Sequence, residues 1–125
     1  MRFSWNLVAA ALLFIGTNAA NIRRQDEYVS DFRIWSEQVC AGSGNRGIWA
    51  ITKGLTETCQ PSFKAPDNIV KAVELNYMVE GCSLTVYSSN DCGEGAREIK
   101  IGACEETSDI EDNFLSFKVT CSAQC

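Results

Sequence analysis

The chain repeats itself, and this internal repeat restricts the fold more than any other feature of the sequence. In each half a β-branched residue, an aromatic residue and a serine are followed by three residues and a cysteine, at 34–40 and 86–92. Glycines and an arginine lead into a strand-like stretch, a second cysteine, and an Asp-Asn pair separated from that cysteine by seven residues. A repeat of this kind is one supersecondary unit, so each copy is expected to cover the apolar face of the other.

The stretches between the turn residues alternate with period two, as half-buried strands do. In one of them Leu84 points to one face and Thr85 to the other. Glycine clusters separate these stretches, and no segment of the mature chain keeps an amphipathic helix pattern over three turns. We therefore predict an all-β fold in which two duplicated Greek-key motifs, residues 31–79 and 80–125, pack as one disulfide-stapled β-sandwich domain.

The first 20 residues are predicted to be a secretory signal peptide. Arg2 supplies the charged start, residues 7–16 form the apolar run, and Ala19 lies in a small-residue cleavage site. The run is too short for a membrane anchor, which takes about 20 apolar residues. The expected location is therefore secreted and extracellular.

Residues 21–30 are expected to form a flexible segment between the signal peptide and the domain. The dibasic pair that ends at Arg24 fits a cleavage site for a furin- or kexin-like protease, and it equally fits two solvated arginines. Without Arg2, ten of the 11 basic residues remain against 16 acidic ones. Because phosphate neutralisation supplies most of the affinity for nucleic acids, this balance disfavours nucleic acids and anionic membranes as partners.

All seven cysteines lie in the mature part, which in a small secreted chain indicates a disulfide framework with one cysteine left over. The chain contains no histidine, which excludes Ser-His-Asp and Cys-His catalysis and histidine-liganded zinc. The carboxylates of residues 105–112 share one short loop, which offers no cleft for a catalytic pair. We predict that the protein is not an enzyme and acts by binding.

The order of these features resembles the βγ-crystallin motif, in which an aromatic residue, a glycine-bearing turn and a long loop precede a last strand. The second half carries the motif at Tyr87, Gly95, Asp112, Asn113, Ser116 and Val119. The first half carries it at Trp35, Gly44, Asp67, Asn68 and Leu75. Cysteines stand near the position where the family has an aromatic residue in the turn, so this chain departs from the pattern there.

A cysteine-stapled, secreted version of this motif is similar to crystallin-like small secreted proteins of filamentous fungi, several of which are apoplastic effectors. The resemblance implies a virulence-associated binding protein with an extracellular protein or carbohydrate target, belonging to a host. An antimicrobial or killer-type toxin is one alternative, although such toxins are usually cationic. A proteinase inhibitor that displays residues 60–66 is the other alternative.

The resemblance also implies a candidate calcium site, because crystallin-like sites use carboxylate, carbonyl and hydroxyl oxygens from both motifs. Asp112, Asn113 and Ser116 supply this pattern in the second half. In the first half Lys71 stands where a hydroxyl is expected, and its ammonium group would repel the ion. Turn and capping chemistry is therefore the preferred role of the Asp-Asn pairs, and no cofactor is expected.

The repeat predicts part of the disulfide pairing. If the halves are equivalent, their shared cysteines should pair equivalently, which selects Cys40–Cys59 and Cys92–Cys104. Each of these bonds would close a loop within one motif and stabilise the fold by about 3 kcal/mol.

The remaining cysteines have no counterpart in the first half. Cys82 starts the first strand of the second motif and Cys121 ends its last strand, and these strands lie side by side in a Greek key. We predict Cys82–Cys121, with Cys82–Cys125 as the competing pair. The left-over Cys125 is then unpaired or links a homodimer.

One aromatic residue is a candidate for a binding contact. The repeat aligns Trp49 with Lys100, an outward position, so Trp49 is expected to be exposed and able to anchor a partner. Trp35 and Tyr87 are matched across the repeat and are expected to pack in the core.

Overall fold

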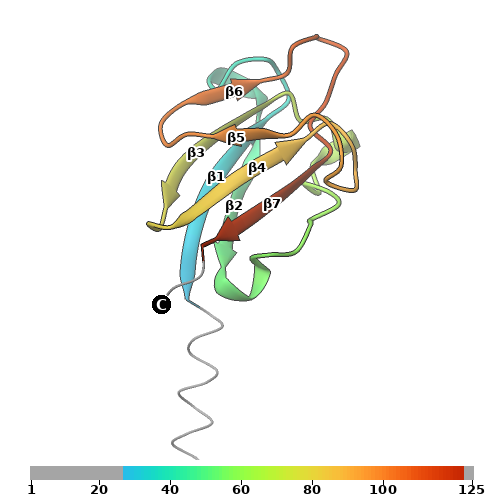
Figure 1. Ribbon diagram of the computed structural model, residues 1–125. Coiled ribbons are helices and arrows are strands. Elements are labelled where there is room, and N and C mark those ends of the chain that lie inside the picture. The colour runs from blue at the N-terminus through green and yellow to red at the C-terminus, as the bar shows by residue number, and fades with distance from the viewer. Residues whose placement is uncertain (1–26, 123–125) are drawn as a thin grey trace, which may run out of the picture.

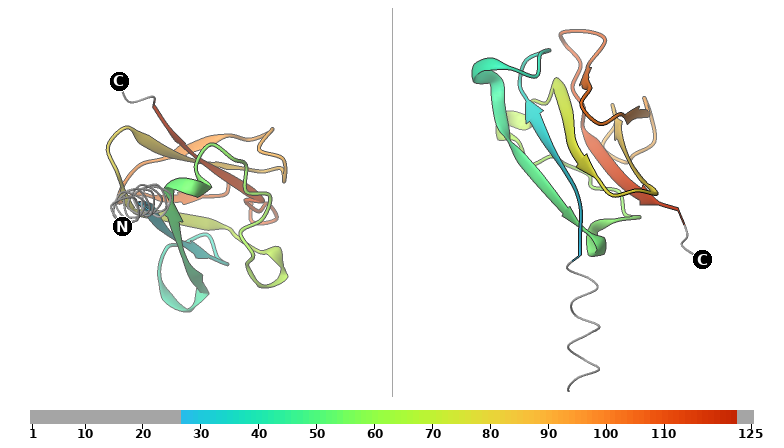
Figure 2. Two further views of the ribbon diagram at one scale, coloured as in Figure 1. Left: turned by 90° about the horizontal axis from the view of Figure 1, so that it is seen from below. Right: turned by 90° about the vertical axis from the view of Figure 1, so that its left-hand side faces the viewer.

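The computed structural model describes residues 27–122, which form seven strands and three single turns of 3-10 helix. The strands are β1 (Tyr28–Trp35), β2 (Asn45–Thr52), β3 (Ala72–Met78), β4 (Cys82–Tyr87), β5 (Arg97–Ile99), β6 (Cys104–Glu106) and β7 (Ser116–Cys121) (Figure 1). One antiparallel sheet has the order β2-β1-β3-β6 and the other the order β5-β4-β7. The two sheets lie face to face, as the right-hand view of Figure 2 shows. The predicted all-β, disulfide-stapled sandwich is confirmed.

The predicted signal peptide, the processing residues Ala19 and Arg24, and Cys125 lie outside the described residues. The prediction of a flexible segment up to residue 30 is wrong at its end, because β1 already begins at Tyr28. Ser30 is buried and its hydroxyl donates to the carbonyl oxygen of Tyr77 at 2.8 Å, so this part of the chain belongs to the sheet. Within residues 27–122 no helix is long and apolar enough to cross a membrane.

The core lies between the sheets and is centred on Phe117 of β7. Its ring centroid is 5.1 Å from that of Phe32 in β1, 5.2 Å from that of Trp49 in β2 and 4.8 Å from that of Phe63. Phe32 and Phe117 are fully buried. Because offset and edge-to-face contacts of this kind add to the free energy of burial, this aromatic cluster ties the two sheets together.

The two halves of the sandwich have matching hydrogen bonds, as the repeat requires. The backbone N–H of Lys71 donates to the carbonyl oxygen of Trp35 at 2.8 Å, and that of Leu115 donates to Tyr87 at 2.8 Å. Trp35 and Tyr87 end the first strands of their halves, and each acceptor is reached from the residue before the last strand. Strands β1, β2 and β3 therefore correspond to β4, β5 and β7.

The third extended segment of each half crosses to the sheet of the other half. Strand β6 of the second half pairs with β3 of the first, with Glu105 opposite Val73. In return, Gln60 of the first half bridges Phe117 of β7, with backbone hydrogen bonds of 2.8 and 3.1 Å. Gln60 and Glu105 each follow the second cysteine of their half, so the exchange is symmetric and interlocks the two motifs.

This exchange overturns two predicted disulfides. Cys40 is bonded to Cys104 and Cys59 to Cys92, so neither Cys40–Cys59 nor Cys92–Cys104 forms. Each third segment carries its cysteine into the other half, next to the loop that follows the other half's first strand. Equivalence of the halves allows two patterns, pairing within halves or crossed pairing, and the exchange of strands selects the crossed one.

The third bond is the predicted one. Cys82 and Cys121 lie directly opposite each other where β4 and β7 pair, and they form a disulfide with a Cα–Cα distance of 3.9 Å. This confirms Cys82–Cys121 over the competing Cys82–Cys125. The expectation that Cys125 links a homodimer stays a prediction.

Candidate functional site

A pocket of about 380 Å³ opens where the long connection of the first half meets the loops of the second. One wall comes from the connection between the second cysteine of that half and β3, and consists of Pro61, Ser62, Phe63, Ala65, Asn68 and Val70. The other wall consists of Asn90, Phe114 and Leu115. We call these nine residues the asparagine pocket. Its volume is near the lower end of the range of ligand pockets, about 300–1,000 Å³.

The floor of the asparagine pocket is apolar and its rim is polar. Phe63, Val70 and Phe114 are exposed by 4%, 1% and 3%, so they form a packed base that belongs to the core. Asn68 and Asn90 are exposed at the rim, and none of the nine residues carries a charge. A small apolar base with a few polar groups around it is the usual composition of a ligand site.

The Cys59–Cys92 disulfide joins the two walls of the pocket. Pro61 lies two residues after Cys59, and Asn90 lies two residues before Cys92. The bond holds the two Cα atoms 6.0 Å apart. Because a covalent link spans the walls, their separation is fixed before any ligand enters, which reduces the ordering cost of binding.

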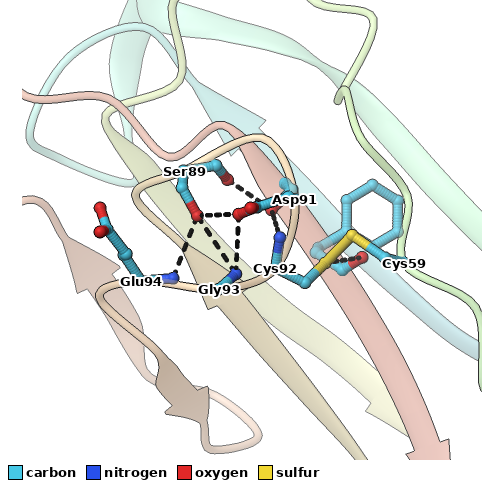
Figure 3. Close-up of a disulfide and its surroundings, with 8 residues drawn as sticks. Cys59, Ser89, Asp91, Cys92, Gly93 and Glu94 are labelled. Atoms are coloured by element: carbon cyan, nitrogen blue, oxygen red, sulfur yellow. Dashed lines mark hydrogen bonds between the residues drawn. A yellow bond between two sulfur atoms is a disulfide. The ribbon is translucent and has the colours of Figure 1, made fainter.

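The loop between β4 and β5 that carries Asn90 is ordered by its own hydrogen bonds (Figure 3). The hydroxyl of Ser89 donates to Asp91 Oδ1 at 2.7 Å and accepts from the backbone N–H groups of Gly93 and Glu94 at 3.2 and 3.0 Å. Asp91 Oδ1 also accepts from the Gly93 N–H at 3.1 Å. Side chains that bond the backbone a few residues on stabilise turns of this kind.

The backbone around the pocket is in an unfavourable conformation. Left-handed φ angles occur at Lys64 (54°), Asp67 (58°), Asn68 (56°) and Cys92 (57°), which are four of the five non-glycine residues of the described chain with positive φ. Aspartate and asparagine tolerate this region, whereas lysine and cysteine adopt it at a cost. Such residues concentrate at ligand sites, so their position around one pocket supports its being functional.

The equivalent place in the other half is closed by hydrogen bonds. The side-chain amide of Gln38 donates to the carbonyl oxygen of Thr107 at 2.7 Å and to its hydroxyl at 3.2 Å. The N–H of Thr107 donates to the carbonyl oxygen of Lys71 at 2.9 Å, and Thr107 is buried. The equivalent contacts in the pocket would run from the Asn90 amide to Ser62 and from the Ser62 N–H to the carbonyl oxygen of Leu115. Within residues 27–122 neither of these hydrogen bonds forms.

The calcium candidates are engaged with protein groups. Lys71 Nζ donates to the carbonyl oxygen of Asp112 at 2.7 Å and lies 3.2 Å from Asn113 Oδ1. The buried hydroxyl of Ser116 donates to the Ser89 carbonyl oxygen at 2.6 Å and accepts from the Cys92 N–H at 3.1 Å. The ammonium group thus takes up oxygens that a calcium ion would use, and Ser116 fixes the loop next to the pocket. The described residues contain no group of three His, Cys, Asp or Glu side chains that could hold a metal ion.

Trp49 is not the exposed contact that the repeat predicts. Its Nε1 donates to the carbonyl oxygen of Phe63 at 2.9 Å, and its half-buried ring packs against the core. Trp35 is buried, as expected, although its Nε1 has no hydrogen-bond partner within residues 27–122, and Tyr87 is half-buried. The structure therefore places no tryptophan of the described chain on the surface as an anchor.

The predicted orientation of Trp49 is wrong because β2 contains one residue more than the equivalent strand β5 before this point. Trp49 lies opposite Phe32, and the equivalent residue Leu84 lies opposite Ile99, so Trp49 corresponds to inward Ile99. A register shift between β1 and β2 inserts one extra residue ahead of this point. Because a slip of one residue moves every side chain to the other face, it is Ile48 that points outward, with 58% of its surface exposed.

The acidic loop and the proposed inhibitor segment also have defined positions. Glu105 forms an ion pair of 3.2 Å with Arg97, while the other carboxylates of residues 105–112 are exposed. In the segment 60–66, Phe63 is buried and exposed Lys64 is left-handed. The segment is therefore not extended along its whole length, and the inhibitor role stays a prediction.

The pocket was not predicted as one site from the sequence, although residues 61–65 belong to the proposed inhibitor segment and Asn68 to an Asp-Asn pair. The signal was present as differences between the halves: asparagine stands where the other copy has glutamine, and Ser62 where it has threonine. Comparisons of the chain with protein-family models, with curated proteins and with solved structures found no match.

Proposed function

We propose that this protein is a secreted, non-catalytic recognition protein that acts outside the cell and binds its target through the asparagine pocket. The observation that carries the proposal is the difference between two equivalent positions of a duplicated fold. One position is closed by Gln38 and Thr107. The other is open, joined across its walls by a disulfide and bordered by asparagine amides that bond no other residue of the described chain.

Three disulfides within about 100 residues support the extracellular part of the proposal, because such bonds persist in oxidising compartments. The matching hydrogen bonds of the two motifs within one domain support the resemblance to crystallin-like secreted proteins. That resemblance extends the proposal to a role as an effector that meets a host molecule in the apoplast.

The test compares the wild-type protein with a variant whose pocket is filled. Ser62→Trp places an indole at the pocket wall, and Ser43→Trp adds the same side chain at an exposed turn of the same half, outside the pocket. Each purified protein is infiltrated into plant leaves, with a disulfide-reduced sample as a further control, and ion leakage from the tissue is measured.

We expect leakage from the wild-type protein and from Ser43→Trp, and none from Ser62→Trp. A wild-type protein without any effect would refute the effector role. An equal response to both tryptophan variants, with folding verified by circular dichroism, would refute the pocket as the site.

A further inference from the structure

The asparagine pocket is built for an uncharged ligand. None of its nine lining residues is ionisable, although the full chain has a formal net charge of −5. The charged neighbours Lys64 and Asp67 are exposed and do not line it. A charged ligand group would lose water in this pocket without gaining an opposite charge, which is strongly unfavourable.

The rim of the pocket offers donors and acceptors together. Asn68 and Asn90 are exposed, and none of the side-chain hydrogen bonds within residues 27–122 involves their amide groups. The Ser62 hydroxyl accepts from the Lys64 N–H at 2.9 Å, which leaves its proton free to donate. An amide provides two N–H donors and a carbonyl acceptor, so this rim suits ligand groups that donate and accept at once, as hydroxyl groups do.

The surroundings of the pocket favour a compact ligand over an extended peptide. Peptides usually add to a free strand edge, where the backbone supplies most of the hydrogen bonds. The wall from 61 to 70 contains no strand, and Gln60 next to it is already paired with Phe117. A ligand here has to be held by side chains and by the apolar floor.

We infer that the asparagine pocket binds a neutral sugar residue, with the apolar C–H face of the ring on Phe63 and Phe114 and its hydroxyl groups on Asn68 and Asn90. This inference rests on the proposed function and names the chemical class of its target. A wall polysaccharide and the glycan of a glycoprotein both present such a ring, and the recognised chemistry is the same.

The test is a titration of the ¹⁵N-labelled mature protein, followed by NMR at the side-chain amide signals of Asn68 and Asn90. The ligands are the methyl glycosides of glucose, mannose, galactose and N-acetylglucosamine, with glucuronic acid and glucosamine as charged counterparts. Soluble β-glucan, soluble mannan and a high-mannose glycoprotein are separate arms that distinguish the sources. We expect at least one neutral sugar to shift both signals saturably, and both charged sugars to bind at least tenfold more weakly than it does.

Three variants make the result specific. Asn90→Ala and Asn68→Asp, the latter chosen because aspartate tolerates the left-handed backbone, should each weaken binding at least tenfold. Asn76→Ala is the matched control, because Asn76 is exposed on β3 outside the pocket, and it should bind as the wild type does. Unchanged thermal unfolding of each variant shows that the fold is intact.

Absence of any shift, stronger binding of the charged sugars, or an equal loss in the Asn76→Ala control would each overturn the assignment of the ligand class. If leaf activity is still lost in Ser62→Trp, the proposed function stands and only the sugar is wrong. If Ser62→Trp is fully active as well, both proposals fail.

Discussion

Removal of the Cys59–Cys92 bond tests whether a covalent link organises the asparagine pocket. The two cysteines are 33 residues apart, and a loop of this length stabilises a fold by about 3.7 kcal/mol through the entropy of the unfolded chain. Cys40–Cys104 encloses this loop, so the unfolded chain is already restricted and we expect a loss of about 3 kcal/mol in Cys59→Ala/Cys92→Ala. For a domain of this size the loss corresponds to a fall in Tm of about 15 °C.

The matched control is Cys82→Ala/Cys121→Ala. These cysteines are 39 residues apart, and loop entropy predicts a similar loss of about 3.9 kcal/mol. Their bond lies at the end of the β4–β7 pair opposite to Tyr87 and Ser116, where the pocket loops begin. We therefore expect both double variants to be destabilised, and only Cys59→Ala/Cys92→Ala to lose binding to the pocket.

Urea unfolding followed by tryptophan fluorescence measures the free energy of unfolding, and the shifts of the Asn68 and Asn90 amide signals on ligand addition measure the pocket. An unchanged unfolding midpoint in Cys59→Ala/Cys92→Ala would refute the stabilising role of the bond. Full ligand response in that variant, or equal loss in both double variants, would refute its role in holding the pocket walls.

The remaining predictions concern the register, the pH dependence and the odd cysteine. Ile48→Lys should change the free energy of unfolding by less than about 0.5 kcal/mol, whereas Trp49→Lys should cost about 3 kcal/mol or prevent folding; equal urea midpoints would contradict the assigned register. Burial away from water raises the pKa of Tyr28, and the hydrogen bond to the Asp31 carboxylate raises it further, from 10.0 to about 12. The tyrosine's contribution to stability is therefore complete below pH 10 and is lost between pH 10 and 12. Tyr28→Phe should remove that part of the fall in thermal stability with pH. A homodimer linked through Cys125 predicts a band of twice the mass on a non-reducing gel that is absent in Cys125→Ser, and a monomeric wild type would contradict it.

The sheets and the fold class could be predicted because they depend on features that the sequence displays directly. Residues such as Leu84 and Thr85 alternate with period two, and every predicted strand region contains a strand or a bridge. The Cys82–Cys121 bond also followed, because neighbouring antiparallel strands bring their opposite ends together. These are local properties of strands and of their immediate partners.

The wrong predictions concern features that depend on contacts between segments far apart in the sequence. The exchange of third strands is invisible in the spacing of cysteines, because pairing within halves and crossed pairing both treat the halves alike. The orientation of Trp49 depends on a single extra residue in β2. Most side chains of this edge strand are exposed whichever face they point to, so the alternation of apolar and polar residues does not reveal the extra residue. The pocket itself depends on hydrogen bonds that fail to form, and a search for matches between the halves passes over such positions.

Rebuilding the closed arrangement in the open half tests this last point. In Ser62→Thr/Asn90→Gln the pocket walls carry the same side chains that close the equivalent place at Thr107 and Gln38. The longer amide can then reach the opposite wall, and each new hydrogen bond should raise the free energy of unfolding by about 1 kcal/mol while ligand binding is lost. The reverse change, Gln38→Asn/Thr107→Ser, is the control: it should lower stability by a similar amount and leave binding in the asparagine pocket unchanged. Retained binding in the rebuilt variant, measured by the same amide signals, would mean that the difference between the copies does not create the site.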